Sequence, residues 1–458
     1  MLRRNSNTTG YSSVQSLDAD IDLPALHRRT PQRYPFLLQS TASASSLACF
    51  DILFACPGDS LVLEAVGSLD DRDTTGGFLA ALDDWWRKEL AKALPSDLPF
   101  LGGWFLYLGY EMAAEIEPSL SLDTDPVLPA AFAVRCKAAI IRNTESGQCH
   151  LVCENDAAVD IDAILADIAT IECCHTTIDE PSLVKPDVHE DPANDFTAAV
   201  RCAKQYIAAG DVYQANLSRG WSANLDEHLD ADRIYASLSR SNPAPFAGIV
   251  RWNDATIISS SPERLLKIRD GAISTRPIAG TRPRSDDQEL DDSLSAELLS
   301  HPKELAEHVM LIDLERNDLG RVCVAGSVEV DEMMVLESYA HVHHIVSNVR
   351  GKLMEDVTPG DAIRAVFPGG TITGCPKVRC MEIIQELEGE PRGAYTGSFG
   401  YLNRDGSLDL NILIRTMVLR GNEMSFRAGS GIVADSEPDA ELEETRAKAE
   451  GMLRALSP

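Results

Sequence analysis

The stretch GSFGYLNRDGSLDLNILIRTMVLRGNEMSFRAGSG, residues 397–431, decides the fold class. Apolar and polar residues alternate along it, and tight-turn pairs at 405–406 and 421–422 interrupt the alternation, which is typical of antiparallel strands. A helix is predicted directly afterwards over 436–456, where the spacing of Ser436 and Asp439 matches a capping box. Antiparallel strands interleaved with helices predict an α+β fold, with sheets packed as a layered core and helices around them.

The rest of the chain is predicted to contain further helices and strands, arranged in four segments. Further helices are predicted over 81–94, over 195–209 with a stop at Gly210, over 290–316, and from Pro376 to Gly389. Short apolar runs predict strands over 50–55, 131–136 and 149–154. The predicted segments are a disordered N-terminus over 1–20, an N-terminal subdomain over 21–175, an acidic linker over 176–195 and a catalytic domain over 196–456.

Charge and cysteine content narrow the class of protein. The 458 residues include 41 Lys and Arg against 71 Asp and Glu, so the net charge is -30. This charge disfavours nucleic acid and anionic membranes as main partners, and an anionic substrate would need cations or a metal within its site. No apolar run approaches the roughly 18 residues of a membrane span. Eleven cysteines without paired C-x-x-C spacing predict reduced thiols and a cytoplasmic location.

Two pairs of glutamates stand three residues apart on predicted helices: Glu304 with Glu307, and Glu441 with Glu444. Each pair projects from one helix face. Four carboxylates suit a hard cation such as Mg²⁺, which accepts few protein ligands and keeps waters. A solvated acidic surface gives the same pattern, and Lys448, four residues after Glu444, equally describes an ordinary surface ion pair.

Two turns rich in small residues, FPGGTITG at 367–374 and AGSG at 428–431, can bring backbone N–H groups close to a carboxylate. A plain strand-to-helix turn is the alternative. Arg415 stands in the apolar run NILIRTMV, and a buried arginine without an anionic partner is costly, which favours a binding role. Candidate anion contacts are Thr371, Thr373, Arg415, Gly429, Ser430, Gly431 and Lys448.

Two further motifs hold groups that move or donate protons. Glu263 in SSSPERLL follows a strand-like run and a proline, a position from which a carboxyl group can act as a general acid, although a surface carboxylate is the alternative. In YAHVHHIVS, strand alternation places His341 and His343 on one face and His344 on the other, which does not favour zinc. One of these histidines is predicted to donate a hydrogen bond to the substrate.

Together these segments resemble the chorismate-binding family, which includes component I of anthranilate synthase and of aminodeoxychorismate synthase, and the isochorismate and salicylate synthases. The motifs occur in family order over 195–456, from GDVYQANLS through SSSPERLL, HPKELAEHVMLIDLERNDLG, FPGGTITGCPKVR and GAYTGSFGY to ELEETRAK. RYPFLLQS at 33–40 is similar to the N-terminal part of the aminating synthases. The resemblance implies an anthranilate synthase component I-like fold.

The same resemblance implies a role for each residue singled out above. Glu304, Glu307, Glu441 and Glu444 become ligands of Mg²⁺, and Glu263 becomes the acid that helps the C4 hydroxyl group of chorismate to leave. The catalytic residues are then Glu263, Gln214 and His344, and the substrate-binding residues are Thr371, Thr373, Tyr395, Arg415, Gly429, Ser430, Gly431 and Lys448.

By this resemblance, Gln214 distinguishes two branches of the family. Members that add water have a lysine at this position as general base, whereas members that add ammonia resemble this chain in having glutamine. The resemblance therefore implies a subunit that converts chorismate and ammonia to 4-amino-4-deoxychorismate, for para-aminobenzoate and folate biosynthesis. The chain has no G-x-C-x-G-type nucleophile turn, so a separate glutaminase subunit, component II, is expected to deliver the ammonia in a heterodimer.

One departure from the family pattern and one further resemblance keep alternatives open. Many aminodeoxychorismate synthases have PIKGT, whose lysine forms an adduct at ring carbon 2, whereas this chain has PIAGT with Ala279, as anthranilate synthases do. Anthranilate synthase component I is therefore the alternative function, and a non-catalytic binding module is a hypothesis of another class. LLQS at 37–40 resembles the segment where tryptophan regulates anthranilate synthases, so Ser40 is a candidate tryptophan-pocket residue or simply a buried strand end.

Overall fold

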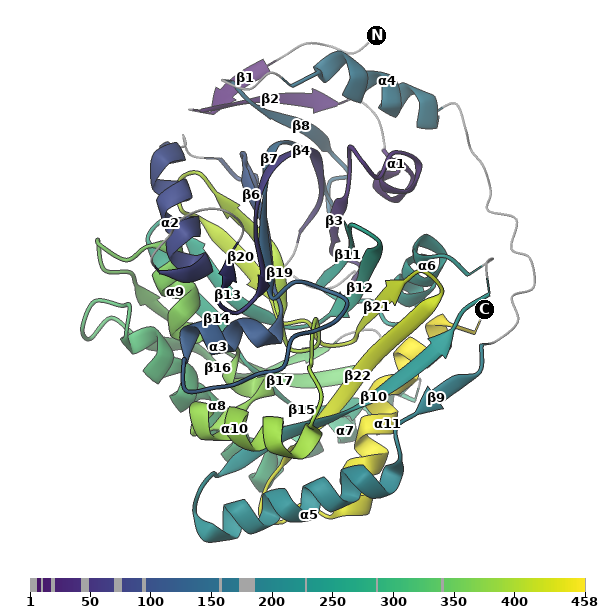
Figure 1. Ribbon diagram of the computed structural model, residues 1–458, viewed down its shortest axis with the longest axis vertical. Coiled ribbons are helices and arrows are strands. Elements are labelled where there is room, and N and C mark those ends of the chain that lie inside the picture. Colours follow the sequence, from purple (N-terminus) through teal and green to yellow (C-terminus); the bar gives the residue numbers. More distant parts are fainter. Residues whose placement is uncertain are drawn as a thin grey trace.

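The computed structural model describes residues 6–9, 11–17, 21–42, 49–69, 76–92, 96–155, 159–172, 186–226, 229–285, 287–338 and 342–457 (Figure 1). Its helices and 3-10 turns are α1 Leu23–Arg29, α2 Gly77–Glu89, η1 Tyr110–Met112, α3 Ala113–Ile116, α4 Ile161–Glu172, α5 Ala193–Ala209, α6 Ala231–Ser241, α7 Gln288–Ser300, α8 Pro302–Gly320, α9 Pro359–Val366, η2 Gly370–Ile372, α10 Lys377–Glu388 and α11 Pro438–Ala455.

The strands are β1 Ser6–Thr9, β2 Ser12–Leu17, β3 Phe36–Gln39, β4 Phe50–Ala65, β5 Ser68–Leu69, β6 Gly103–Leu108, β7 Ala131–Asn143, β8 Cys149–Glu154, β9 Val188–Glu190, β10 Gln214–Asn224, β11 Phe246–Trp252, β12 Ala255–Ser261, β13 Arg264–Arg269, β14 Ala272–Arg276, β15 Ile278–Pro283, β16 Glu329–Ser338, β17 Val342–Lys352, β18 Gly374–Cys375, β19 Ser398–Asn403, β20 Leu408–Asn411, β21 Thr416–Arg420 and β22 Glu423–Ile432.

The strands form one antiparallel network that spans both halves of the chain. β3 pairs with β11 and β6 pairs with β19, so strands from the first 110 residues join strands from beyond residue 245. The core is shared in the same way, since Leu37 and Ile140 lie in one apolar cluster with Ile234 and Met452. The α+β fold is thus confirmed. The sheet and the apolar core both include residues from the predicted segments 21–175 and 196–456, so neither stops at the boundary between them.

Two predicted helices of the second half end as expected. α5 ends before Gly210 and α10 ends before Gly389, and both glycines adopt the left-handed conformation, with φ of 82° and 65°. A residue with a β-carbon rarely adopts this conformation, so glycine stops a helix there at little cost. Both helices pack against β10, the strand that begins at Gln214 (Figure 1).

Two helix starts differ from the prediction, and both lie at a proline. The helix predicted over 290–316 is two helices, α7 and α8, because His301 precedes Pro302 and takes an extended conformation with ψ of 111°. Pro438 likewise starts α11. Ser436 does not form the predicted capping box, because its hydroxyl oxygen accepts a hydrogen bond from the N–H of Val433 at 3.0 Å.

The segment over 397–431 forms two hairpins rather than one continuous meander. β19 pairs with β20, and β21 pairs with β22. β20 lies against β13 and β21 lies against β12, so residues 412–415 carry the chain from one hairpin to the other. Arg415 belongs to this connection and has a φ of 52°, so the prediction of an arginine inside a strand is wrong.

The N-terminal residues differ from the disordered segment predicted over 1–20. Residues 6–9 and 12–17 form β1 and β2, and β2 pairs with β8 along its whole length. The pairing supplies hydrogen-bond partners for the backbone N–H and C=O groups on the edge of β8 that faces away from β7. The polar side chains of the segment give no sign of this backbone pairing. In the predicted linker, β9 pairs with β10 and α5 begins at Ala193, while residues 173–185 lie outside the described part.

Candidate functional site

The centre of the candidate site is the antiparallel pair of β10 and β22, in which Asn216 stands opposite Gly431. A β-carbon on Gly431 would lie 2.2 Å from Nε2 of Gln214, and a β-carbon on Gly429 would lie 2.9 Å from Oδ1 of Asn216. The side chains of Gln214 and Asn216 therefore lie over the two glycines, in space that only glycine leaves open.

Tyr395 and Lys448 approach the same strand from two other elements. The hydroxyl group of Tyr395, from the loop that joins α10 to β19, would lie 2.7 Å from a β-carbon on Gly429. Lys448 of α11 donates a hydrogen bond to the carbonyl oxygen of Gly429 at 3.0 Å and forms an ion pair with Glu444 at 2.7 Å. Side chains from β10, α11 and the Tyr395 loop thus meet at β22, as the predicted site requires.

Glu263 lies between β12 and β13, and only 4% of it is exposed. Burial raises the pKa of Glu263 to about 7, and the negative charge of Glu315 acts in the same direction, while Thr371 and Arg415 oppose the rise. A carboxyl group with a pKa near 7 keeps a large protonated fraction at neutral pH, so Glu263 has the proton affinity of a general acid.

The two threonines of the η2 turn face different surroundings. Thr371 lies close enough to Glu263 for its hydroxyl to lower the pKa of that carboxyl group. This buried hydroxyl makes no hydrogen bond within 3.5 Å in the described part of the chain. Thr373 instead donates its hydroxyl to the carbonyl oxygen of Gly369 at 2.9 Å. Its own carbonyl oxygen accepts from the N–H of Asn216 at 2.9 Å. The geometry therefore favours Thr371 as a ligand contact. Thr373 joins η2 to β10 in this conformation, and its substrate contact stays a prediction.

His344 of β17 is buried, and its Nδ1 lies 3.2 Å from the carbonyl oxygen of Gly280. The hydroxyl of Thr281 lies closer to Nδ1, at 3.0 Å, so Nδ1 has two hydrogen-bond partners on β15. Burial lowers the pKa of His344 to about 3, and the charges of Arg415 and Lys448 lower it further. The ring is therefore neutral, with one nitrogen that donates and one that accepts, and the substrate contact of His344 stays a prediction.

The other two histidines of YAHVHHIVS do not join His344. The ring of His343 lies 2.7 Å from the hydroxyl of Ser338 and 3.0 Å from Asp291, so both nitrogens have partners away from the glycines. His341 lies outside the described residues.

Five buried polar atoms have no hydrogen-bond partner among the described residues of this site. They are Oε1 of Gln214, Oδ1 of Asn216, Oε1 of Glu263, Oγ1 of Thr371 and Oγ of Ser430. An unsatisfied buried polar atom costs about 1–3 kcal/mol, so folded proteins keep few of them. Their occurrence together indicates a site built to hydrogen-bond a polar ligand. Asn216 was missed in the sequence, although it stands two residues from Gln214 and so faces the same side of β10.

The glutamates of α8 are close to β15. Oε2 of Glu304 would lie 3.1 Å from a β-carbon on Gly280, and Oε1 of Glu304 lies 3.3 Å from Arg282. Glu307 follows on the next part of the same helix and is half-buried. Glu304 therefore approaches the strand segment whose carbonyl oxygen contacts His344.

The glutamates of α11 approach from the other side. Glu441 is buried, and exposed Glu444 is paired with Lys448, whose charge also acts on His344. In the described part of the chain, no three Asp, Glu, His or Cys side chains are gathered as a metal-binding group. The carboxylate donors fit the oxygen preference of Mg²⁺, but Arg282 and Lys448 neutralise two of the four in this conformation.

The remaining predictions concern Ser40 and Ala279. The N–H of Ser40 donates to Oδ1 of Asp51 at 3.0 Å, while its neighbours Leu38 and Gln39 line a cavity of about 1540 Å³ that Ser40 itself does not line. The tryptophan pocket therefore stays a prediction. Ala279 pairs with Ile345 of β17 and offers only a methyl group.

The sequence pattern of the family described as chorismate binding enzyme matches residues 64–454. The chain belongs to this family. Among chorismate-binding enzymes, the anthranilate synthase component I-like protein of Synechocystis is 43% identical over 372 residues, covering 80% of this chain and 75% of that protein. Aminodeoxychorismate synthase component 1 of Bacillus subtilis is 42% identical over 384 residues, covering 81% of this chain and 80% of that protein.

The crystal structure of anthranilate synthase component I from Streptococcus pneumoniae has the same fold as this chorismate-binding enzyme. The two match with a TM-score of 0.77 and 32% identity, over 89% of this chain and 93% of that chain. The family resemblance drawn from the ordered motifs is thereby confirmed, and both aminating product classes occur among relatives of similar identity.

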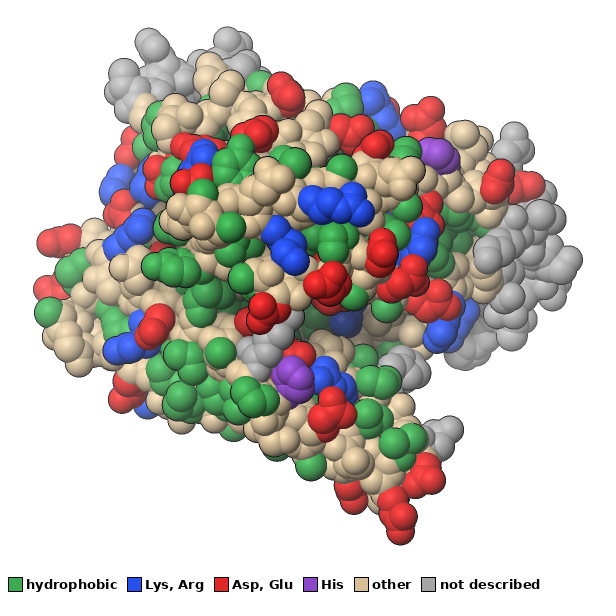
Figure 2. All heavy atoms as spheres, turned by 90° about the horizontal axis from the view of Figure 1, so that it is seen from below, with side chains coloured by type: hydrophobic (Ala, Val, Ile, Leu, Met, Phe, Trp, Pro, Cys, Tyr) green, Lys and Arg blue, Asp and Glu red, His purple; other side chains and the backbone are tan. Residues whose placement is uncertain are grey.

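The surface of this chorismate-binding enzyme is mixed in charge on the face shown in Figure 2. Lys and Arg side chains are interspersed with Asp and Glu around a hollow near the middle of that face. The net charge of -30 is therefore not gathered into one acidic field there, which eases the approach of an anion. Among the helices described, none is both long and apolar enough to cross a membrane.

Proposed function

We propose that this chain is the aminating subunit of an aminodeoxychorismate synthase, which converts chorismate and ammonia to 4-amino-4-deoxychorismate. The observation that carries the aminating assignment is Gln214, whose side chain lies directly over Gly431. An amide cannot remove a proton from water, whereas ammonia is already a nucleophile and needs no general base. A glutamine here is therefore compatible with addition of ammonia and unsuited to addition of water.

The chemistry follows from the groups around β10 and β22. Glu263 in its protonated form donates a proton to the C4 hydroxyl group of chorismate, which leaves as water. The ammonia nitrogen forms its bond to carbon 4, so the step yields a protonated amine and the Glu263 carboxylate. Arg415 and Lys448 supply positive charge for the substrate carboxylates, and Nε2 of His344 forms a hydrogen bond with the substrate. Mg²⁺ held by Glu304, Glu307, Glu441 and Glu444 would add positive charge at those carboxylates. Gln214 and Asn216 orient the ammonia or the ring.

Motif resemblance supports the aminodeoxychorismate branch over the anthranilate branch. GDVYQANLS and FPGGTITG are typical of the former, and the Bacillus subtilis relative carries that product in its name. Ala279 favours the alternative, anthranilate synthase component I, because its methyl group cannot form the carbon 2 adduct made by the lysine of PIKGT. Under the first proposal the pyruvyl ether stays on the product, and under the second it is lost.

A glutaminase subunit is part of the proposal. The Bacillus subtilis relative is named as component 1 of its synthase, which supports a second component that supplies ammonia here as well. We place the protein in the cytoplasm, because the described cysteines are all free thiols and a reducing compartment keeps them so.

Product identification by mass spectrometry tests the proposal. The chain is incubated with chorismate and Mg²⁺, and with ammonium, with glutamine, or with glutamine and a glutaminase subunit. We expect a product that contains new nitrogen and still carries the pyruvyl ether, with ammonium or with glutamine plus the subunit. Anthranilate with free pyruvate would favour the alternative, isochorismate would refute the role of Gln214, and no turnover under any condition would favour a binding module.

A further inference from the structure

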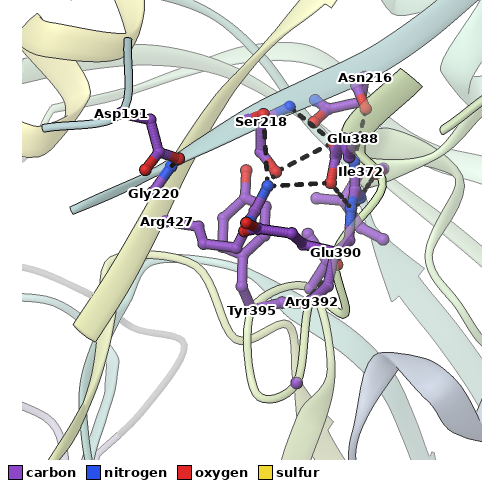
Figure 3. A network of polar contacts seen from close by, with 12 residues as sticks. Asp191, Asn216, Ser218, Gly220, Ile372, Glu388, Glu390, Arg392, Tyr395 and Arg427 are labelled. Carbon is purple, nitrogen blue, oxygen red and sulfur yellow. Dashed lines mark hydrogen bonds and ion pairs between the residues drawn. The ribbon is translucent and has the colours of Figure 1, made fainter. Parts of the chain in front are cut away.

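A buried ion pair lies behind the substrate-facing side chains. Glu388, the last residue of α10, pairs with Arg392 at 2.6 Å, and the side chains are 2% and 1% exposed (Figure 3). Arg427 of β22 pairs with the same carboxylate at 3.2 Å. The N–H and the hydroxyl of Ser218 also donate to Glu388, at 2.7 and 3.0 Å. One carboxylate thus holds two arginines against the face of β10 that carries Gln214 and Asn216.

Arg392 uses all five of its N–H donors. Two bonds go to Glu388, at 2.6 and 3.0 Å. The others reach three separate segments: the carbonyl oxygen of Asn216 on β10 at 2.7 Å, that of Ile372 in η2 at 3.2 Å, and the hydroxyl of Thr396 at 3.4 Å. Each of these segments also carries a side chain of the proposed site.

The guanidinium group of Arg392 also contacts rings. Its central carbon lies 5.6 Å from the ring centroid of Tyr395 and 4.9 Å from that of Tyr110. The hydroxyl group of Tyr395 therefore lies close to Gly429, and its ring lies against the guanidinium group of Arg392. A planar fork of five donors suits such simultaneous contacts, whereas a lysine ammonium group is a compact point charge.

A buried ion pair gives little stability by itself, because the cost of removing two charges from water offsets most of their attraction. Stability alone therefore does not account for Arg392. Arg427 shows the contrast. Its bonds go to Ser218, Glu388 and Glu390, so it contacts the Tyr395 loop only through the exposed side chain of Glu390, and none of its bonds to described residues reaches η2.

We propose that Arg392 is a positioning residue, which fixes β10, the η2 turn and the Tyr395 loop relative to one another around the substrate. This role rests on the proposed function. Arg392 does not touch the substrate in this proposal. It acts through Asn216, Thr371 and Tyr395, whose polar groups must converge on one ligand.

Two matched variants test the role. Arg392→Lys and Arg427→Lys both keep a positive charge against Glu388, so both are expected to fold with similar melting temperatures. Arg392→Lys loses the contacts to η2 and to the Tyr395 loop, so we expect a fall in kcat/KM on the order of tenfold or more, through a higher KM for chorismate. Arg427→Lys should stay within about twofold of the wild type, because its loss leaves the three segments joined.

The outcomes separate this role from the function on which it rests. A wild-type chain without turnover would overturn the proposed function and the role together, whereas equal kinetics of the two lysine variants would overturn the role alone. Should Arg392→Lys not fold, Arg392→Gln and Arg427→Gln take the place of the two lysine variants, because each leaves Glu388 paired with the other arginine. A larger rise in KM for Arg392→Gln supports the role, and equal values refute it.

Discussion

Glu263 is the residue on which the chemical step of the proposal depends. Its carboxyl group is buried, and Oε1 has no hydrogen-bond partner among the described residues. Glu263→Gln keeps the size of the side chain and removes the acidic proton, so we expect turnover to fall by about 10²- to 10⁴-fold. Chorismate affinity, measured by titration calorimetry, should stay nearly unchanged. Glu423→Gln, at an exposed position of β22, is the control, and unchanged turnover in Glu263→Gln would refute the role.

The pH dependence of the reaction should report the same carboxyl group. Burial raises the pKa of Glu263 to about 7, so the protonated form required of an acid is present below this value and is lost as the pH rises through it. We therefore expect kcat/KM to fall above about pH 7. Glu315→Gln removes a nearby negative charge that raises the pKa of Glu263, so this fall should move to lower pH. A profile that does not move would contradict the coupling of Glu263 to Glu315.

At the scale of elements, the pairing of β10 with β22 explains why glycine is required at 431. A β-carbon there would meet the end of the Gln214 side chain, which can move, rather than backbone. We expect Gly431→Ala to cost about 1–3 kcal/mol of unfolding free energy while turnover falls further than stability does, because Gln214 is displaced. Chemical denaturation and steady-state kinetics measure the two effects. Gly320→Ala, where no atom lies within 4 Å, is the control, and full activity of Gly431→Ala would contradict the placement of Gln214.

The proposed Mg²⁺ site at Glu304 of α8 can be tested by metal binding alone, without measuring turnover. Arg282 lies 3.3 Å from Glu304, so it competes with any cation bound there. We expect Arg282→Met to strengthen Mg²⁺ binding severalfold and Glu304→Gln to weaken it, in calorimetric titrations without chorismate. Arg284→Met is the control, because Arg284 pairs with Asp291 instead. Equal Mg²⁺ affinity in all the variants would argue against a site at Glu304.

Features of the fold that depend on neighbouring residues were predicted from the sequence. Features that depend on contacts between residues far apart in the chain were missed. Gly210 and Gly389 end their helices for a reason contained in the residue itself. Arg415 was placed in a strand because its neighbours are apolar, yet its position depends on which strands β20 and β21 pair with. The contacts of Arg392 likewise join residues far apart in the chain, so no spacing pattern reveals them.

At the scale of the molecule, the two halves of the chain depend on each other. β11 and β19 of the second half hydrogen-bond to β3 and β6 of the first. Without these partners, β11 and β19 would expose unpaired edges and the apolar cluster that contains Leu37 and Met452 would be divided. The segments separated in the sequence analysis are therefore expected to behave as one cooperative unit.

Calorimetry and a fragment test this cooperativity. We expect a single unfolding transition for the whole chain, and we expect residues 196–458 produced alone to aggregate or to lack native near-ultraviolet circular dichroism. Supplying residues 1–195 as a separate chain during expression should restore folding, because the missing strands then reach β11 and β19. Two separate transitions, or a fragment that folds and binds chorismate by itself, would show that the catalytic half has a sufficient core of its own. In that case the pairings of β3 and β6 would serve to dock the two halves and not to fold them.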